Sequence, residues 1–227
     1  MAKLLIIDTA LEEAIVALSK DGKIIGELTN KETHNHASFI QVAIEKLLQD
    51  EQMEISELDA IVVTLGPGSY TGLRVGLATA KGIAYTLQKP LIGLSTLSAL
   101  AAAAIQVAPK PIDSACQIFS MIDARRMEVF GAIYDTSLNS IVQEQALVLD
   151  QAKWNSLIGQ PTICIGNGYF KTKDFTSPYQ VTYFEGSYTN QILHDLAMAK
   201  WKAGQFEDLA YVGPNYLKEV YILPKKI

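Results

Sequence analysis

Cysteine and long apolar runs are scarce in this chain of 227 residues. Its only cysteines, Cys116 and Cys164, lie in apolar segments. We therefore expect buried thiols and neither a disulfide nor a metal site. The longest apolar stretch, residues 97–108, is too short to span a bilayer. Residues 4–7 lack the longer apolar region and the cleavage site of a signal peptide. These absences predict a cytoplasmic protein with no membrane partner.

Positive charge is also in deficit. The chain has 19 basic and 24 acidic residues, a net charge of −5, and its only arginines are Arg74, Arg125 and Arg126. Proteins that hold a phosphate backbone usually display a clear basic face. No such face is visible in the sequence, which argues against nucleic acid as the primary ligand.

Histidine is equally rare. His34 and His36 flank a single residue in a polar stretch, but no third ligand is close in sequence, so a surface loop is a better interpretation than a zinc site. His194 is isolated on a predicted helix and is expected to pack or to face water. No Ser/His/Asp grouping, nucleophile elbow or metal-spaced carboxylate cluster is present. We expect no metal and no catalytic residue.

The pattern of apolar residues predicts two similar halves. Strands are expected at residues 3–8, 14–19, 23–29, 58–65 and 90–93, and helices at 38–49, 72–87 and 95–107. After the prolines at 109 and 111 the pattern restarts, with strands at 115–123, 128–135, 140–149 and 161–165 and helices at 151–158 and 189–203.

A β-β-β-α-β-α-β unit that occurs twice is typical of the actin, sugar-kinase and Hsp70 (ASKHA) class, in which two related lobes face a nucleotide cleft. We therefore predict an α/β fold of two related lobes with mixed sheets. The first lobe would comprise residues 1–108. The second would comprise residues 109–227, with the C-terminal tail packed back on the first lobe.

The segment from Gly66 to Leu87 is the most distinctive part of the chain. Glycines at 66, 68 and 72 permit a tight turn, and Ser69 or Thr71 can cap the following helix. Such a turn can hold an anion on backbone N–H groups. It lacks the lysine of a Walker A loop, however, and a strand-to-helix turn that needs glycine only for its shape is the simpler interpretation.

A cofactor site at this turn would use Asp8, Gly66, Gly68 and Ser69, which are weak candidates. Asp8 ends the first strand, where it could assist a metal or could simply hydrogen-bond the hairpin backbone. The helix that follows the turn is rich in glycine and alanine. Glycine inside a helix is unfavourable by about 1 kcal/mol relative to alanine, so close approach of another backbone is the expected reason.

Three segments together resemble the TsaB (YeaZ) family. They are residues 4–9 (LLIIDT), residues 66–76 (GPGSYTGLRVG) with 80–82 (AKG), and residues 123–129 (DARRMEV). Without the resemblance, the third segment would be interpreted only as a charged hairpin. The tail at 214–218 (PNYLK) resembles the ending of that family.

The resemblance implies a subunit of the bacterial tRNA N6-threonylcarbamoyladenosine (t6A) system, which modifies adenosine 37. A family member would be a non-catalytic scaffold without a cofactor that binds and activates the TsaD transferase in a heterodimer. It would form a homodimer when alone, join TsaE in a larger complex and meet tRNA only indirectly.

The resemblance also implies an interface and a departure from TsaD. After the strand at 90–93, TsaD presents two metal-binding histidines, and the matching positions here are Thr96 and Leu100, which cannot replace them. The shared surface would be built from the helices at 38–49 and 72–87. Its expected residues are Ile40, Ile44, Leu47, Leu73, Arg74, Gly76, Leu77, Ala80, Lys81 and Ala84.

Two alternatives remain open at this point. One is a nucleotide-binding ATPase or small-molecule kinase of the ASKHA class that uses Asp8 and the turn at 66–72. The other is a peptidase, which would need a metal or a nucleophile that the sequence does not display.

Overall fold

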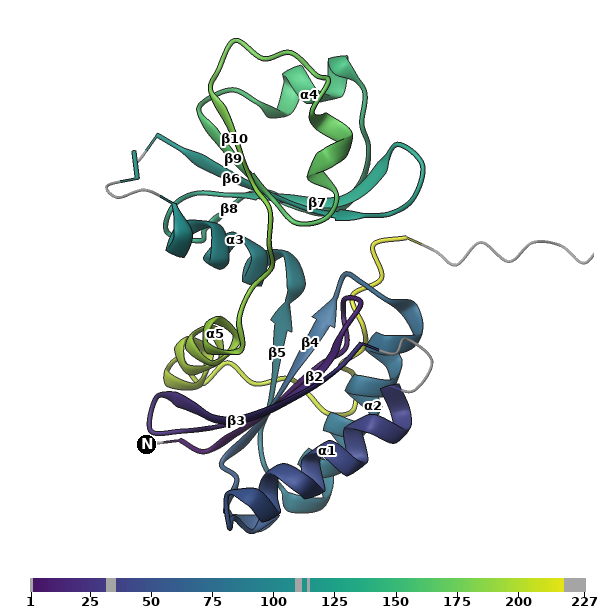
Figure 1. The fold of residues 1–227 in the computed structure, drawn as a ribbon, viewed down its shortest axis with the longest axis vertical. Helices are drawn as coiled ribbons and strands as arrows, with labels where there is room; N and C mark the ends of the chain where they lie inside the picture. The colour runs from purple at the N-terminus through teal and green to yellow at the C-terminus, as the bar shows by residue number, and fades with distance from the viewer. Residues whose placement is uncertain (1, 32–35, 109–111, 114, 219–227) are drawn as a thin grey trace, which may run out of the picture.

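Two five-stranded mixed sheets lie one above the other along the long axis of the molecule (Figure 1). The computed structural model describes residues 2–31, 36–108, 112–113 and 115–218. Two features from the sequence lie outside the described residues: the prolines at 109 and 111, where we expect the boundary between the halves, and His34. Among the described residues no helix has the length and apolarity needed to cross a membrane.

The two sheets share one strand order. The first runs β3-β2-β1-β4-β5, and the second runs β8-β7-β6-β9-β10. In each, the first three strands are antiparallel and the last two are parallel additions beside the central strand. The bounds are β1 (Leu4–Asp8), β2 (Ala14–Lys20), β3 (Lys23–Asn30), β4 (Ala60–Gly66), β5 (Leu91–Ser95), β6 (Gln117–Asp123), β7 (Glu128–Tyr134), β8 (Ser140–Val148), β9 (Thr162–Ile165) and β10 (Val181–Phe184). The predicted duplication and the ASKHA-type α/β fold are therefore confirmed.

One strand was not predicted. β10 has four residues, Val181–Phe184, all half-buried, and no alternation of polarity distinguishes it from the surrounding loop. It becomes a strand because it pairs in parallel with β9, from Val181 opposite Thr162 to Phe184 opposite Ile165. Pairing with a neighbouring strand, and not local sequence, decides this element.

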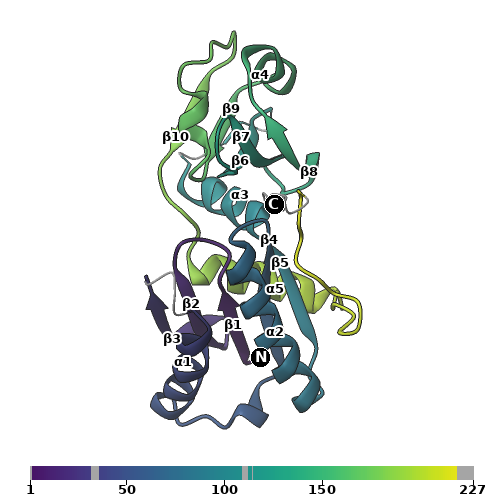
Figure 2. The same ribbon diagram turned by 90° about the vertical axis from the view of Figure 1, so that its right-hand side faces the viewer.

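Helices cover the outer face of each sheet. α1 (His36–Asp50) and α2 (Tyr70–Leu87) pack together on the first sheet, and the short 3-10 helix η1 (Ile55–Glu57) precedes β4. α4 (Gln151–Leu157) and the 3-10 helix η2 (Tyr169–Thr172) lie against the second sheet. Figures 1 and 2 show these helices at the two ends of the molecule.

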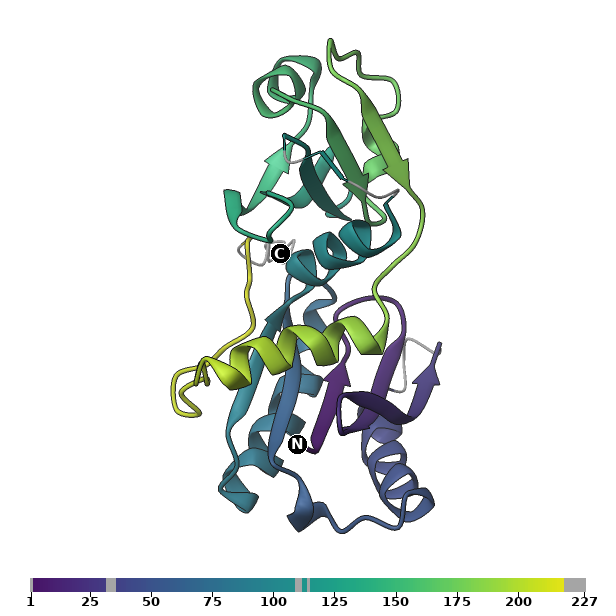
Figure 3. The same cartoon turned by 90° about the vertical axis from the view of Figure 1, so that its left-hand side faces the viewer.

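The two remaining helices lie between the sheets, and each packs against the sheet of the other half. α3 (Thr96–Val107) follows β5 but packs mainly on β6, β7 and β9. α5 (Asn190–Lys202) follows β10 but packs on β1, β3 and β5, as Figure 3 shows. The helix predicted at 189–203 follows the strands of the second half in sequence, but its apolar face packs on the first sheet.

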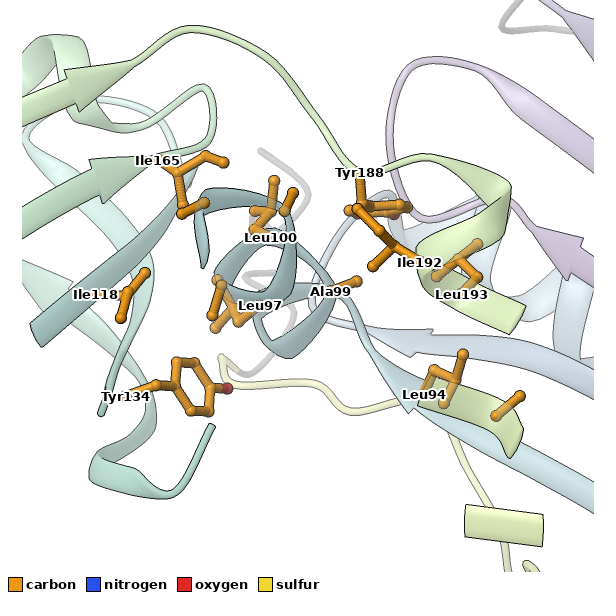
Figure 4. Packing of buried hydrophobic residues seen from close by; sticks show 14 of the residues in the cluster. Leu94, Leu97, Ala99, Leu100, Ile118, Tyr134, Ile165, Tyr188, Ile192 and Leu193 are labelled. Carbon is orange, nitrogen blue, oxygen red and sulfur yellow. The ribbon is translucent and has the colours of Figure 1, made fainter. Parts of the chain in front are cut away.

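This exchange creates the central core. In Figure 4, Leu97 and Leu100 of α3 point toward Ile118 and Ile165 of the second sheet, and Ala99 on the other side of α3 faces α5. Tyr188, Ile192 and Leu193 belong to the same buried cluster. Burial of this continuous apolar cluster holds the two sheets together.

Candidate functional site

The glycine turn after β4 packs directly on the turn between β1 and β2. A Cβ atom added to Gly68 would lie under 3.0 Å from the carbonyl oxygen of Ala10, and one on Gly72 equally close to that of Thr9. Real Cβ atoms essentially never come so close, so these positions require glycine. The backbone N–H of Ser69 donates to the Ala10 carbonyl at 2.7 Å. The turn thus holds two backbone segments of the same chain together.

Ser69 is the N-cap of α2. The sequence offered Ser69 and Thr71 as candidates for this cap. The Ser69 Oγ accepts a hydrogen bond from the Gly72 N–H at 3.2 Å. Gly66 has a φ of +108°, which a glycine adopts readily. The N–H groups of Ser69 and Gly72, two of those that an anion would use at this turn, are engaged within the protein.

Asp8 is buried at the junction of the two lobes, with 2% of its surface exposed. Its Oδ1 accepts from the Ala10 N–H at 3.0 Å and from the Thr64 hydroxyl at 2.7 Å, and its Oδ2 accepts from the Tyr188 hydroxyl at 2.8 Å. Burial raises the pKa of Asp8 although these three donors favour the ionised form. Both carboxylate oxygens accept hydrogen bonds from within the chain. This favours a structural role for Asp8 over a role in metal binding.

Two adjacent pockets, of about 320 and 290 Å³, lie between the lobes where the ASKHA class holds a nucleotide. They share Leu11, Glu12, Ile122 and Asn167, and Asp8 and Glu13 line the larger one. No lysine or arginine is among their described lining residues. Acidic side chains without a cation oppose the phosphates of a nucleotide, so the pockets do not favour the ATPase or kinase alternative.

Most of the predicted interface residues are buried within the first lobe. Eight of the ten complete the packing of the lobe: Ile40, Ile44, Leu47, Leu73, Gly76, Leu77, Ala80 and Ala84. In this structure the apolar stripe of each helix covers its own sheet, so these side chains are not exposed to a partner. Arg74 is exposed, and Lys81 is half-buried with its Nζ donating to the Val212 carbonyl at 3.1 Å.

Other residues form the exposed side of these two helices. Val42 of α1 is 64% exposed and Tyr85 of α2 is 78% exposed. Two small residues of α2, Ala78 and Gly82, are also exposed. A Cβ on Gly82 would meet nothing within 4 Å, whereas one on Gly76 would collide with the Thr9 hydroxyl. Packing inside the chain therefore explains Gly76 but not Gly82.

The positions aligned with the metal-binding histidines of TsaD are buried. Thr96 is fully buried at the start of α3, and Leu100 is part of the central core. The described residues include no group of three or more His, Cys, Asp or Glu side chains that could hold a metal ion. Leu100 here supplies packing between the sheets.

The isolated histidine and the cysteines pack as expected. His194 is buried, its Nδ1 lies 2.9 Å from the Ser19 Oγ, and burial lowers its pKa. Cys116 and Cys164 are free, buried thiols whose pKa values are raised by burial. His36 begins α1, but its side chain is not among those described.

Residues far apart in the sequence join the two lobes, and the sequence did not single them out. Glu144 of β8 accepts hydrogen bonds from the Ser95 hydroxyl, from the Tyr134 hydroxyl at 3.1 Å and from the Asn215 amide at 2.6 Å. The Asn215 N–H donates to the Leu65 carbonyl at 2.7 Å, so this part of the tail lies against the first lobe. No local pattern marks such residues, because their partners come from other elements.

Comparison with known proteins gives consistent matches. The family profile of TsaD, tRNA N6-adenosine threonylcarbamoyltransferase, matches residues 23–220. The tRNA threonylcarbamoyladenosine biosynthesis protein TsaB of Bacillus subtilis is 32% identical over 170 residues, which cover 72% of this chain and 70% of that protein. TsaB of Haemophilus influenzae is 31% identical over 186 residues, or 76% of this chain and 75% of the relative.

Two further matches agree. TsaB of Escherichia coli is 34% identical over 141 residues, which span 61% of this chain and 58% of the length of that relative. Among solved structures, YeaZ from Pseudomonas aeruginosa superposes with a TM-score of 0.78 at 25% identity, over 96% of this chain and all of the other. The similarity thus extends through both lobes.

Proposed function

Because the chain belongs to the TsaB (YeaZ) family, we propose that it serves the biosynthesis of threonylcarbamoyladenosine in tRNA as a non-catalytic scaffold that binds and activates a TsaD transferase. In this proposal the chain forms a heterodimer with TsaD, joins TsaE in a larger complex and forms a homodimer when alone. It works in the cytoplasm, with no cofactor of its own.

One observation carries the proposal of a scaffold. The groups that an ASKHA enzyme would use for chemistry are engaged in holding this fold. Asp8 accepts three hydrogen bonds from within the chain, and the glycine turn is closed on Thr9 and Ala10. Both features border the pockets between the lobes, but these polar groups already have partners within the chain and are not free for chemistry on a substrate.

The exposed sides of α1 and α2 are the proposed docking surface. Ala78 and Gly82 leave α2 thin at its centre, Tyr85 adds exposed apolar area about one turn further along α2, and Val42 adds exposed apolar area on α1. Small residues let two helix backbones approach closely, and apolar side chains around them exclude water. A partner with the same lobe architecture can present the same two helices, so one surface serves both the heterodimer and the homodimer.

The decisive experiment changes Gly82, not Ala80. Ala80 is fully buried, and a charged residue there would disturb the core. Gly82→Arg adds a bulky side chain where nothing lies within 4 Å. Gly159→Arg is the matched control, because Gly159 is an exposed glycine of the second lobe with equally open surroundings. Both variants are tested for co-purification with the TsaD-family transferase of the same organism and for t6A in tRNA by nucleoside mass spectrometry.

We expect Gly82→Arg to lose both the complex and the modification, and Gly159→Arg to keep both. If the modification persisted after the complex was lost, the scaffold proposal would be wrong. If Gly82→Arg kept the complex, the docking surface would have to lie elsewhere on the molecule.

A further inference from the structure

Two of the three arginines of this acidic chain lie at one pocket, and the third, Arg126, is the next residue of the same turn. Arg125 lines a pocket of about 300 Å³ together with Tyr70, Phe130 and Tyr216. Arg74 stands next to it, with its guanidinium carbon 4.1 Å from the centre of the Tyr70 ring. Its Nε donates to the Tyr216 hydroxyl at 2.9 Å. α2, the β6–β7 turn and the tail thus bring together residues that the sequence separates widely.

The guanidinium groups at this pocket form no close ion pair with a described carboxylate. Asp123 is the one described acidic group whose pKa Arg125 lowers in part, after burial, which raises that pKa, and Lys171, which lowers it more. Within the described chain no ion pair includes an arginine. The two acidic residues that flank the turn are already paired: Asp123 with Lys171, and Glu128 with Lys218. The pocket and the adjoining turn therefore carry an excess of positive charge on a protein whose net charge is −5. An anion is the complementary ligand.

The backbone of the turn supports this assignment. Arg125 and Arg126 have φ values of 69° and 50°, and both side chains are exposed. Residues other than glycine or asparagine rarely adopt this left-handed conformation. Glycine would fold more easily at both positions, so the arginine side chains have a use other than folding.

The composition of the pocket favours a nucleotide of RNA over a protein carboxylate. Guanidinium groups recognise phosphate oxygens through paired hydrogen bonds. Tyr70 and Tyr216 stack on each other with ring centroids 4.9 Å apart. A base can extend such an aromatic stack, whereas a carboxylate cannot. The acidic remainder of the protein repels RNA, so a strand would be held at this pocket alone.

We propose that the pocket between Arg74, Arg125 and Tyr216 is a direct contact site for single-stranded RNA, with the arginines on phosphate groups and the aromatic side chains beside a base. This inference rests on the proposed function, in which the substrate of the complex is tRNA. It departs from the expectation that tRNA meets this chain only indirectly, which followed from the lack of a basic stretch in the sequence.

The test measures binding of the full-length protein to a fluorescein-labelled single-stranded RNA by fluorescence anisotropy. Three neutralised phosphates predict that log Kobs falls with log salt with a slope of about −2. Arg125→Gly with Arg126→Gly should weaken binding about tenfold or more and bring the slope near −0.7. Lys23→Ala with Lys202→Ala removes the same charge from exposed sites elsewhere and should change binding little.

The glycine variant should melt no lower than the wild type, because glycine suits the backbone of this turn. If it nevertheless unfolds, Arg125→Lys with Arg126→Lys keeps the charge but loses the paired hydrogen bonds, and it should bind RNA more weakly. Equal RNA binding by the wild type and the arginine variants would overturn the proposal. So would full competition by ATP, which would make the pocket a site for free nucleotides.

The same glycine variant separates this inference from the proposed function. Co-purification with the TsaD-family transferase should be retained, since the pocket does not include the exposed side of α2 around Gly82. Lost RNA binding with an intact complex supports the contact site. A lost complex would show that the turn belongs to the protein interface, against the inference.

Discussion

Gly82→Ala should stabilise the isolated protein. Gly82 lies in the interior of α2 and is exposed, and a Cβ there meets nothing within 4 Å. Alanine is favoured over glycine in a helix by about 0.8–1.0 kcal/mol, since glycine loses more backbone entropy on folding. For a chain of this size, 1 kcal/mol raises Tm by about 2–4 °C.

Gly76→Ala is the matched comparison on the same helix. Its Cβ would collide with the buried Thr9 hydroxyl, which donates to the Gly72 carbonyl at 2.8 Å. The expected sign is therefore opposite, with a loss of about 1–3 kcal/mol from overpacking. Helix propensity alone would predict that both changes stabilise.

Urea denaturation followed by circular dichroism measures both free energies of unfolding. It should be repeated at several protein concentrations, because a homodimer would make the apparent stability depend on concentration. Equal stabilisation by the two changes would refute the packing explanation of Gly76. A loss of stability in Gly82→Ala at the lowest concentration would refute the open environment of Gly82.

Two further changes test the site between the lobes. Gly68→Ala should lower the free energy of unfolding by about 3 kcal/mol or more, because its Cβ would strike the Ala10 backbone; near-normal stability in urea would contradict the close approach of the two turns. Asp8→Asn tests the buried carboxyl. Because burial raises the pKa of Asp8, the folded state holds the proton more tightly than the unfolded chain does. The stability that the protonated carboxyl contributes is therefore lost as pH rises from about 4 through the raised pKa. The variant should lose that slope in urea titrations between about pH 4 and 7, and an unchanged slope would assign the pH dependence to another group.

Much of the secondary structure was predictable because it depends on neighbours in the sequence. The predicted helix at 72–87 corresponds to α2 at Tyr70–Leu87, with Ser69 as its cap. The turn at Asp21 and Gly22 has the positive φ values that join β2 to β3. The duplicated order of elements followed from the same local patterns and indicated the fold class.

The faces of the helices were harder to assign. An apolar stripe with helical spacing predicts that a helix buries one side, but it does not say whether a sheet of the same chain or a partner covers that side. Ile44 and Leu77 were therefore assigned to an interface, and the structure places them in the core of the lobe. The small residues of α2 divide in the same way, since Gly76 packs on Thr9 and Gly82 is open.

The sequence by itself determined most of the elements, the duplicated plan, the buried cysteines and the family resemblance, because periodicity, capping and motif spacing are local properties. Only the tertiary structure decided that α3 and α5 exchange sheets and that Asp8 meets Tyr188, 180 residues away. It also decided that Arg74 and Arg125, 51 residues apart in an acidic chain, meet at one pocket. Such contacts depend on how sheets and helices pack in space, and a linear pattern carries little information about that packing.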